Sequence, residues 1–337
     1  MTEEGGAAVR IGKLAEPVQK RSVLRQLHTD KNQADRLYGT DCVRIGSLVL
    51  TAADRVPCSS AALERSVQNA FASLWAAGAE PQQLLVQGIL PADYEESQLQ
   101  ADMKQIRKAA QQTAVSAGQI EVSSEVQTPQ YFINGIGQAL QEEQFLRPGQ
   151  ELLVTGWIAL GGTALLAERY ESELQKRYPF SLIDRAKEFE KLTAAARDAR
   201  AITHFGAAPM HALGQGGIFG ALWEMAERAG VGLEVDLKKI PIKQETVELC
   251  EYFDINPYEF YSAGALLVGT DQAEALEDWL YSQGIESCVI GRVTDGRERR
   301  IHNGEDCRFL DRPRQDEWFA KLIHSETSLM NTKRSIL

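Results

Sequence analysis

The sequence predicts an α+β protein of two domains, with an arm before them and a polar tail after them. Its 337 residues are enough for two domains of ordinary size, and 44% of them are apolar. In the first half, the expected order is strand, strand, helix, strand, helix, strand, and in the second half strands alternate with glycine-rich turns and helices. We place the arm at 1–37, an α+β domain at 38–150, an α/β domain at 151–312 and the tail at 313–337.

The first domain opens with a predicted hairpin and helix. VRIG and SLVLTAADRV have the composition of two strands, joined at Gly46. Apolar residues recur at helical spacing over 61–77, and Gly78 is the expected end of that helix. Pro81 is expected to close the turn that follows. QLLVQGIL is then a strand.

The rest of the chain also alternates between predicted helices and strands. We expect a long helix over 95–117, stopped by Gly118, and a strand at QIEVSSEV. The second domain begins with a strand, a glycine-rich loop and a helix in ELLVTGWIALGGTALLAERY. A helix is expected over 187–196, and another over 271–281 between the strands GALLVGT and SCVIGRVT.

A glycine cluster in PMHALGQGGIFGALWEMAERA (209–229) is the most informative feature. Gly214, Gly216 and Gly217 run directly into an amphipathic helix. Glycine at such a junction lets backbone N–H groups approach a ligand, and the helix dipole favours an anion there. The segment has the shape of a phosphate cradle, but it contains no lysine and no acidic residue between His211 and Gly217.

The composition of the chain limits the classes of function that it could have. Lys and Arg number 36 against 47 Asp and Glu, a net charge of −11, which argues against nucleic acid as a partner. Five scattered cysteines, without a C-x-x-C pair, predict free thiols in a reducing cytoplasm, and five histidines show no zinc-ligand spacing. The N-terminus does not read as a signal peptide, and no apolar run approaches a membrane span.

Several segments, in a fixed order, resemble one family. GGIFGALWEMAERAGVGLEVDLKKIPI and the following NPYEFYSAGALLVG resemble the C-terminal domain of the AIR synthase-related (PurM-like) superfamily, with the HypE-like hydrogenase maturation proteins nearest in look. YGTDCV resembles the G-D-D-A segment of the family, LVLTAADRV its T-T-D strand, and SVQNAFASLWAAGAEP its N-D-x-x-x-x-G-A-x-P helix. PGQELLVTGWIALGGTALL and CVIGRVTDG resemble later segments.

The resemblance implies a homodimer whose N-terminal domains form a shared β-barrel, with ATP and magnesium in a cleft. It also implies chemistry in which ATP activates an amide or similar oxygen. Carried over to this chain, it makes Asp41, Asp54 and Glu125 candidate metal ligands. It makes the following residues candidate nucleotide contacts: Lys13, Asp41, Asp54, Gly161, Gly162, Gly214, Gly216 and Gly217. His211 is a candidate substrate contact.

The chain also departs from the family pattern. Thr40 replaces the first acid of G-D-D-A, Ser73 the acid of the N-D pair, and Ala212 the acid after His211. The C-terminal cysteine of HypE-like proteins is absent. Phosphoryl transfer depends on positioning and charge neutralisation, so these losses predict a degenerate ATP–magnesium site.

Each candidate has a structural alternative. The glycines would equally suit tight helix–sheet junctions, Asp41 and Asp54 could be solvated turn carboxylates, and Glu125 could simply bind its serine neighbours. Asn69 could be polar by chance, and Cys58 and Cys250 suit packing better than nucleophilic catalysis.

Three functions stay open at this point. The chain could be an ATP-dependent enzyme of AIR synthase type, a non-catalytic relative that binds a nucleotide, metabolite or protein, or a hydrogenase maturation factor with a partner protein. We expect a cytoplasmic protein from its cysteines, and a homodimer from the family resemblance.

Overall fold

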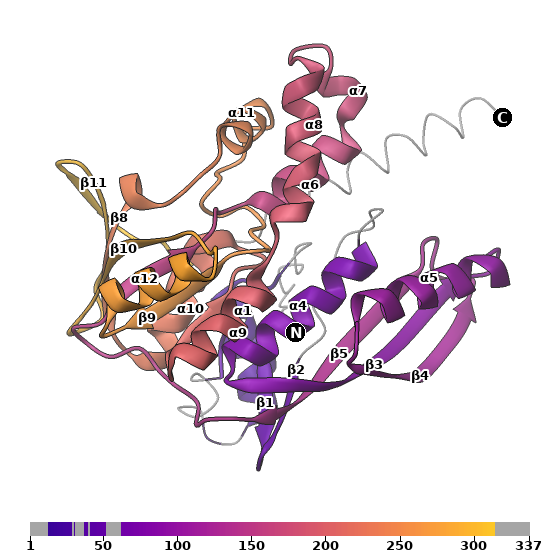
Figure 1. Cartoon of the computed structure of the whole chain (residues 1–337), viewed down its shortest axis with the longest axis horizontal. Coiled ribbons are helices and arrows are strands. Elements are labelled where there is room, and N and C mark those ends of the chain that lie inside the picture. Colours follow the sequence, from indigo (N-terminus) through magenta and orange to yellow (C-terminus); the bar gives the residue numbers. More distant parts are fainter. Residues whose placement is uncertain (1–12, 29, 31–36, 40, 52–61, 314–337) are drawn as a thin grey trace, which may run out of the picture.

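A computed structural model describes residues 13–28, 30, 37–39, 41–51 and 62–313 (Figure 1). Asp54 and Cys58 lie outside this range. The N-terminal arm begins with a short helical stretch of three consecutive pieces: α1 (Glu16–Gln19), the π-helical η1 (Lys20–Leu24) and α2 (Arg25–Leu27). Pro17 stands in the first turn, where its missing N–H costs no helical hydrogen bond.

The first sheet has five strands in the order β1-β2-β5-β3-β4. Its strands are β1 (Cys42–Ile45), β2 (Leu48–Thr51), β3 (Ala79–Pro91), β4 (Ala114–Ser123) and β5 (Gln130–Ala139). Two helices, α4 (Ala62–Ala76) and α5 (Glu96–Ala109), cover one face, and the other face is open in Figure 1. The covered face is apolar because alternate residues of each strand point to it, as Leu84, Val86 and Ile133 do.

The structure confirms the hairpin and the helix over 61–77, but it corrects two boundaries in this domain. Pro81 lies inside β3, not in a turn; it falls where the pairing with β5 shifts register, and β4 pairs only from Gln83 onward. A proline is tolerated at such a place because no ladder hydrogen bond needs its missing N–H.

The helix expected over 95–117 ends at Ala109, and residues 114–117 belong to β4. The alanine-rich segment AAQQTAVSAG favours a helix by propensity, but parallel pairing with β3 overrides it. Strand β5, which the sequence analysis did not identify, is the central partner of β2 and β3.

The second sheet has seven strands in the order β12-β11-β8-β10-β6-β9-β7. They are β6 (Glu151–Thr155), β7 (Met210–Ala212), β8 (Gly232–Asp236), β9 (Leu266–Thr270), β10 (Ser287–Thr294), β11 (Arg299–Asn303) and β12 (Asp306–Phe309). Leu153 faces α9 (Ala195–Phe205) and α12 (Ala273–Ser282), whereas Leu152 and Val154 face α10 (Gly217–Ala229). Both faces of this sheet are therefore covered, and its neighbouring strands are antiparallel except for β8 and β11.

Five of the remaining helices form a separate cluster around α6. They are α6 (Leu160–Arg169), α7 (Glu171–Leu174), α8 (Phe180–Glu188), η2 (Phe189–Leu192) and α11 (Gln244–Tyr252). The short η3 (Leu237–Lys239) lies apart from them, against β10 and β11. The helix expected over 187–196 is wrong, because that range spans the end of α8, η2 and the start of α9. The helix expected over 271–281 is confirmed as α12.

Helix α4 of the first half packs on α9 of the second. Ala72 and Trp75 share one buried cluster with Ile202 and Leu266. The strands of the first sheet all fall within 38–150 and those of the second within 151–312. The first sheet is open within the described residues, so the shared barrel stays a proposal.

Candidate functional site

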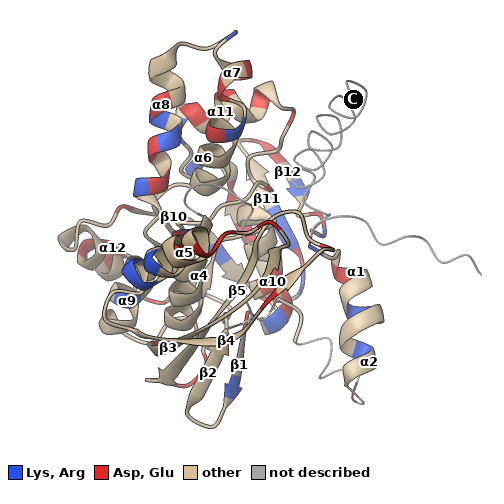
Figure 2. Cartoon of the chain, turned by 90° about the vertical axis from the view of Figure 1, so that its right-hand side faces the viewer, with Lys and Arg blue, Asp and Glu red and all other residues tan. Residues whose placement is uncertain are grey.

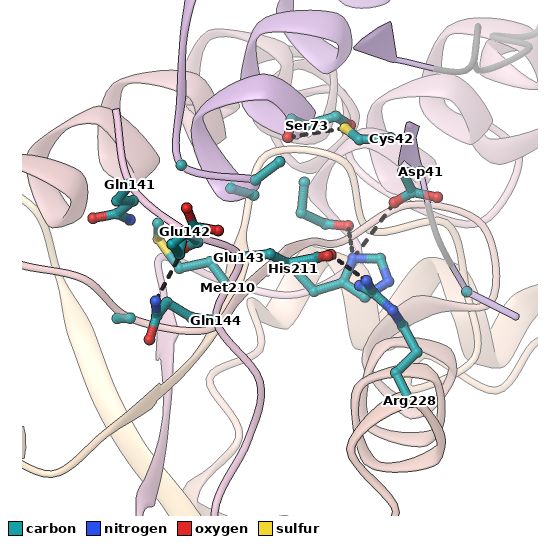
Figure 3. Close-up of a pocket in the computed structure, with 16 residues that line it drawn as sticks. Asp41, Cys42, Ser73, Gln141, Glu142, Glu143, Gln144, Met210, His211 and Arg228 are labelled. Carbon is teal, nitrogen blue, oxygen red and sulfur yellow. Dashed lines mark hydrogen bonds and ion pairs between the residues drawn. The ribbon is translucent and has the colours of Figure 1, made fainter. Parts of the chain in front are cut away.

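A small cavity lies at the junction of α4, β7 and α10. It is lined by side chains and backbone from all three elements and from the segment 141–144 that joins the two sheets (Figure 3). Its volume is ≈ 50 Å³, which is room for a few water molecules or one small oxyanion but not for a whole nucleotide. The residues that matter for its chemistry are Asp41, Cys42, Ser73, Glu142, Glu143, His211, Ala212 and Arg228.

His211 lies on the edge strand β7 with both ring nitrogens facing acceptors. Its Nδ1 is 2.8 Å from the carbonyl oxygen of Ala212, and its Nε2 is 2.9 Å from Oε2 of Glu224. Nδ1 also lies 3.7 Å from Oδ2 of Asp41. Burial alone would lower the pKa of His211, but Glu224 and Asp41 outweigh it and raise the pKa. The geometry suits an imidazolium, because only the charged ring carries a proton on both nitrogens.

Glu224 on α10 is the centre of the buried charge cluster around His211. Its side chain is 3% exposed, and its Oε1 lies 2.7 Å from Nζ of Lys13. Burial raises the pKa of Glu224, but Lys13 and His211 reverse this and hold the pKa well below its ordinary value. The phenol of Tyr38, also buried, has a raised pKa because of burial and the neighbouring Glu224. Lys13, expected to reach a phosphate, is therefore held by a carboxylate here.

Arg228, one turn further along α10, faces the cavity from the other side. It forms an ion pair with Glu143, and its guanidinium carbon lies 5.4 Å from the centroid of the Phe145 ring. Within the described part of the chain, no acceptor reaches the buried Nε of Arg228. The sequence analysis identified neither Glu224 nor Arg228. The only sequence signal was that both carry charge in a helix whose other faces are apolar.

The glycine cluster forms a tight helix–strand junction. Gly216 and Gly217 have φ of +87° and +62°, in the left-handed region that favours glycine. The N–H of Gly217 donates to the Gly214 carbonyl at 3.2 Å, and that of Phe219 donates to the Tyr258 carbonyl at 3.0 Å. Two of the first N–H groups of α10 are thus bound within the protein, which favours the packing alternative for this cluster.

Gly161 and Gly162 are also packed. They lie in the first turn of α6, and an added Cβ on Gly162 would come within 2.5 Å of the Phe260 ring. The N–H of Gly162 donates to the Tyr261 carbonyl at 3.0 Å. The expected glycine-rich loop is therefore the buried start of a helix that needs close contact, and its geometry again favours packing.

The candidate metal ligands do not assemble among the described residues. Asp41 lies beside His211, whereas Glu125 follows β4 in an exposed turn where its N–H donates to Ser123 Oγ at 3.1 Å. No group of three or more His, Cys, Asp or Glu side chains in the part of the chain that the structure describes is arranged to hold a metal. Ser73 and Ala212 leave neutral groups where the family pattern has acids, and Arg228 adds a cation. These residues do not fit a magnesium ion.

Two further residues have structural roles. Asn69 on α4 donates to the Tyr261 hydroxyl at 3.3 Å, which joins the two halves. Cys250 is buried, and burial raises its pKa to about 12, so its thiol is protonated at neutral pH. This supports the packing role expected for Cys250.

The comparisons with known proteins agree with this fold. Residues 147–303 match the model of the AIR synthase related protein, C-terminal domain. A carbamoyl dehydratase HypE of Rhodobacter capsulatus is 29% identical over 152 residues, which are 44% of this chain and 42% of the relative. The chain thus aligns with less than half the length of that curated relative.

Solved structures cover more of the chain. A HypE–HypF complex matches with a TM-score of 0.68 and 21% identity over 81% of this chain and 93% of that one. A HypE structure in complex with ATP matches with a TM-score of 0.65 and 17% identity over 82% and 88%.

Residues 147–303 are therefore similar to the AIR synthase related C-terminal domain, and the chain shares the fold of the HypE structures. The similarity to HypE and to that domain confirms the resemblance that the motifs indicated. Among the described residues, no helix is long and apolar enough to cross a membrane.

Proposed function

We propose that this chain is a HypE-like, AIR synthase-related protein that binds ATP, with a phosphate group in the cavity beside His211, and that its catalytic site is degenerate. One observation carries the proposal. Ser73 on α4 and Ala212 on β7, the two positions where the family pattern has acids, line the same cavity as Asp41 and His211. Residues far apart in sequence thus meet where the resemblance expects phosphate chemistry.

The charges of the cavity indicate how a phosphate would bind. Arg228, paired with Glu143, and the protonated His211 supply the positive charge, and the carboxylates of Asp41, Glu142 and Glu143 line the same cavity. A phosphate would take the place of the Glu143 carboxylate, since a guanidinium binds either anion through paired N–H groups. The remainder of the nucleotide would lie outside this small cavity.

Ligand-dependent stability tests the proposal directly. A ligand that binds only the folded state stabilises it by about 2.7 kcal/mol at a hundred times its Kd. We expect millimolar ATP to raise the Tm, and expect Arg228→Gln to abolish that rise. The control Arg292→Gln removes an exposed arginine paired with Glu234 and should leave the rise intact. An unchanged Tm at millimolar ATP would contradict the proposal.

Degeneracy has its own test. If the missing acids limit turnover, Ser73→Asp with Ala212→Asp should increase ATP hydrolysis above the unmodified chain when magnesium is supplied. Binding of ATP without turnover in the unmodified chain would favour the non-catalytic alternative. Equal turnover in both proteins would show that the lost acids are not limiting.

A second candidate function is hydrogenase maturation with a partner protein. It rests on the fold shared with a HypE that was solved in complex with HypF. For this chain, a maturation partner, a homodimer and a cytoplasmic location remain proposals. Co-purification of the tagged chain with a carbamoyl-transfer protein would support this candidate.

A further inference from the structure

A second and larger cavity lies beside α10 at Glu227, about one turn from the Glu224 that binds His211. Its volume is ≈ 350 Å³, within the range of small-molecule sites. It is bounded by the N-terminal helical stretch, by Glu227 of α10 and by the segment after β12. Its lining residues are Glu16, Pro17, Lys20, Arg21, Arg25, Glu227 and Arg312.

The two carboxylates of this cavity are neutralised inside the protein. Lys20 Nζ lies 2.6 Å from Glu16 Oε1 and 2.6 Å from Glu227 Oε1. The second oxygen of Glu16 accepts from Trp223 Nε1 at 2.9 Å, and that of Glu227 accepts from Arg299 Nη2 at 2.6 Å. Every oxygen of both acids thus has a donor.

Three guanidinium groups, those of Arg21, Arg25 and Arg312, also line the cavity. Four basic side chains and two acidic ones line the cavity. One of the acids, Glu227, also pairs with Arg299, which is not among the lining residues. The lining therefore has an excess of positive charge on a chain whose net charge is −11. Figure 2 shows the basic residues that recur along the α1–α2 stretch.

The helical stretch beside this cavity contains a π-helical turn. Residues Lys20–Leu24 form a π-helical turn between two short α-helical pieces. Such turns are rare and occur frequently at functional sites. Here the turn bears Lys20 and Arg21 and is followed directly by Arg25, so it places three basic side chains along one cavity.

We propose that this cavity binds a small ligand carrying two or more phosphate groups. Its volume suits a compact ligand, and arginine forks match phosphate oxygens in pairs. A long polyanion is disfavoured by the negative charge of the whole chain. Because Glu227 and Glu224 lie on neighbouring turns of α10, a ligand here would also hold the arm against the helix that carries the His211 cluster. This inference does not depend on the proposed ATP function.

Calorimetric titration with tripolyphosphate in EDTA tests it. We expect binding to the unmodified chain, and at least a tenfold weaker Kd for the double variant Arg21→Gln, Arg312→Gln. The conservative variant Arg21→Lys, Arg312→Lys should retain part of the affinity, since it keeps the charge and loses the fork. The affinity should fall as salt is added.

A variant in the His211 cavity distinguishes binding at that cavity from binding at the cavity beside Glu227. Arg228→Gln should remove any binding of tripolyphosphate in the His211 cavity and leave the binding that depends on Arg21 and Arg312 unchanged. If Arg228→Gln abolishes binding while the Arg21, Arg312 double variant does not, tripolyphosphate occupies the His211 cavity and the inference is overturned, although the proposed function stands. Absence of binding, or an unchanged Kd in the double variant with retained circular dichroism, would overturn it as well.

Discussion

Glu224 is buried on α10, and its two oxygens bind Lys13 and His211. Removal of one partner from a buried ion pair leaves the other charge uncompensated, which costs about 3–5 kcal/mol. We therefore expect Glu224→Gln to lower the free energy of unfolding by roughly that amount in urea denaturation. A loss below about 1 kcal/mol would show that the cluster behaves like an exposed pair.

The same pair makes stability depend on pH. Because the folded-state pKa of Glu224 is lowered, its contribution is fully present above its ordinary value of 4.5 and is lost as the pH falls below it. Because the pKa of His211 is raised, its contribution is fully present below 6.5 and is lost as the pH rises through the raised value. We expect this part of the stability to be greatest between pH 4.5 and 6.5. Urea denaturation of the unmodified chain and of Glu224→Gln from well below pH 4.5 to well above pH 6.5 measures it, and a stability difference that stays constant over that wider range would contradict the account.

Gly217 tests the packing role of the glycine cluster. An alanine there would keep φ near +62°, and its Cβ would lie 2.5 Å from the Tyr258 carbonyl oxygen. Gly284 is a matched control, with φ of +69° and nothing within 4 Å of an added Cβ. We expect Gly284→Ala to cost about 1 kcal/mol for the backbone alone and Gly217→Ala to cost clearly more. Equal losses of the free energy of unfolding in urea denaturation would show that the helix–strand junction accommodates the added Cβ without destabilisation.

At the residue scale, the sequence predicted Asp41, His211, Ser73 and Ala212 as members of one site, and the structure brings all four to one cavity. Glu224 could not be predicted because its role depends on Lys13, 211 residues away. No local pattern encodes such a contact.

At the scale of elements, the arm depends on its ion pairs with α10. Lys20 bridges Glu16 and Glu227, and its side chain is only 11% exposed. We expect Lys20→Met to weaken the docking of α1, and amide hydrogen exchange over 16–27 to become roughly tenfold faster. Lys191→Met, which removes an exposed pair with Glu188, is the control. Unchanged exchange in the arm would mean that its apolar contacts suffice.

Elements with strong local signals were predicted well. Helix α4 and the series β9, α12, β10 follow from periodicity and from glycine stops. The first half of strand β4 and the break between α8 and α9 were missed because tertiary pairing and packing override helical propensity there. Strand β5, with two glycines facing Leu74, has too little apolar alternation to be recognised.

At the scale of the whole molecule, the open face of the first sheet carries exposed apolar side chains among polar ones such as Gln83 and Gln138. Val43, Ile45, Leu48 and Phe132 are 60%, 63%, 45% and 39% exposed and lie on that face by the strand register. Exposed apolar side chains that share one sheet face are typical of an interaction surface. It supports the proposed homodimer through the first domain.

We expect the double variant Ile45→Glu, Phe132→Glu to be a monomer in sedimentation velocity at micromolar concentration, where the unmodified chain is a dimer. Tyr281→Glu changes a residue 83% exposed on α12 and should leave the dimer intact. An unmodified chain that sediments as a monomer would contradict the proposed assembly.

The central claim is that a phosphate site remains between α4, β7 and α10 after the loss of its acids. A crystal structure of the chain with a non-hydrolysable ATP analogue tests this most directly. We predict phosphate density beside Arg228 and His211, with Glu143 turned away from the guanidinium. An analogue bound elsewhere, with Glu143 still paired to Arg228, would contradict the account.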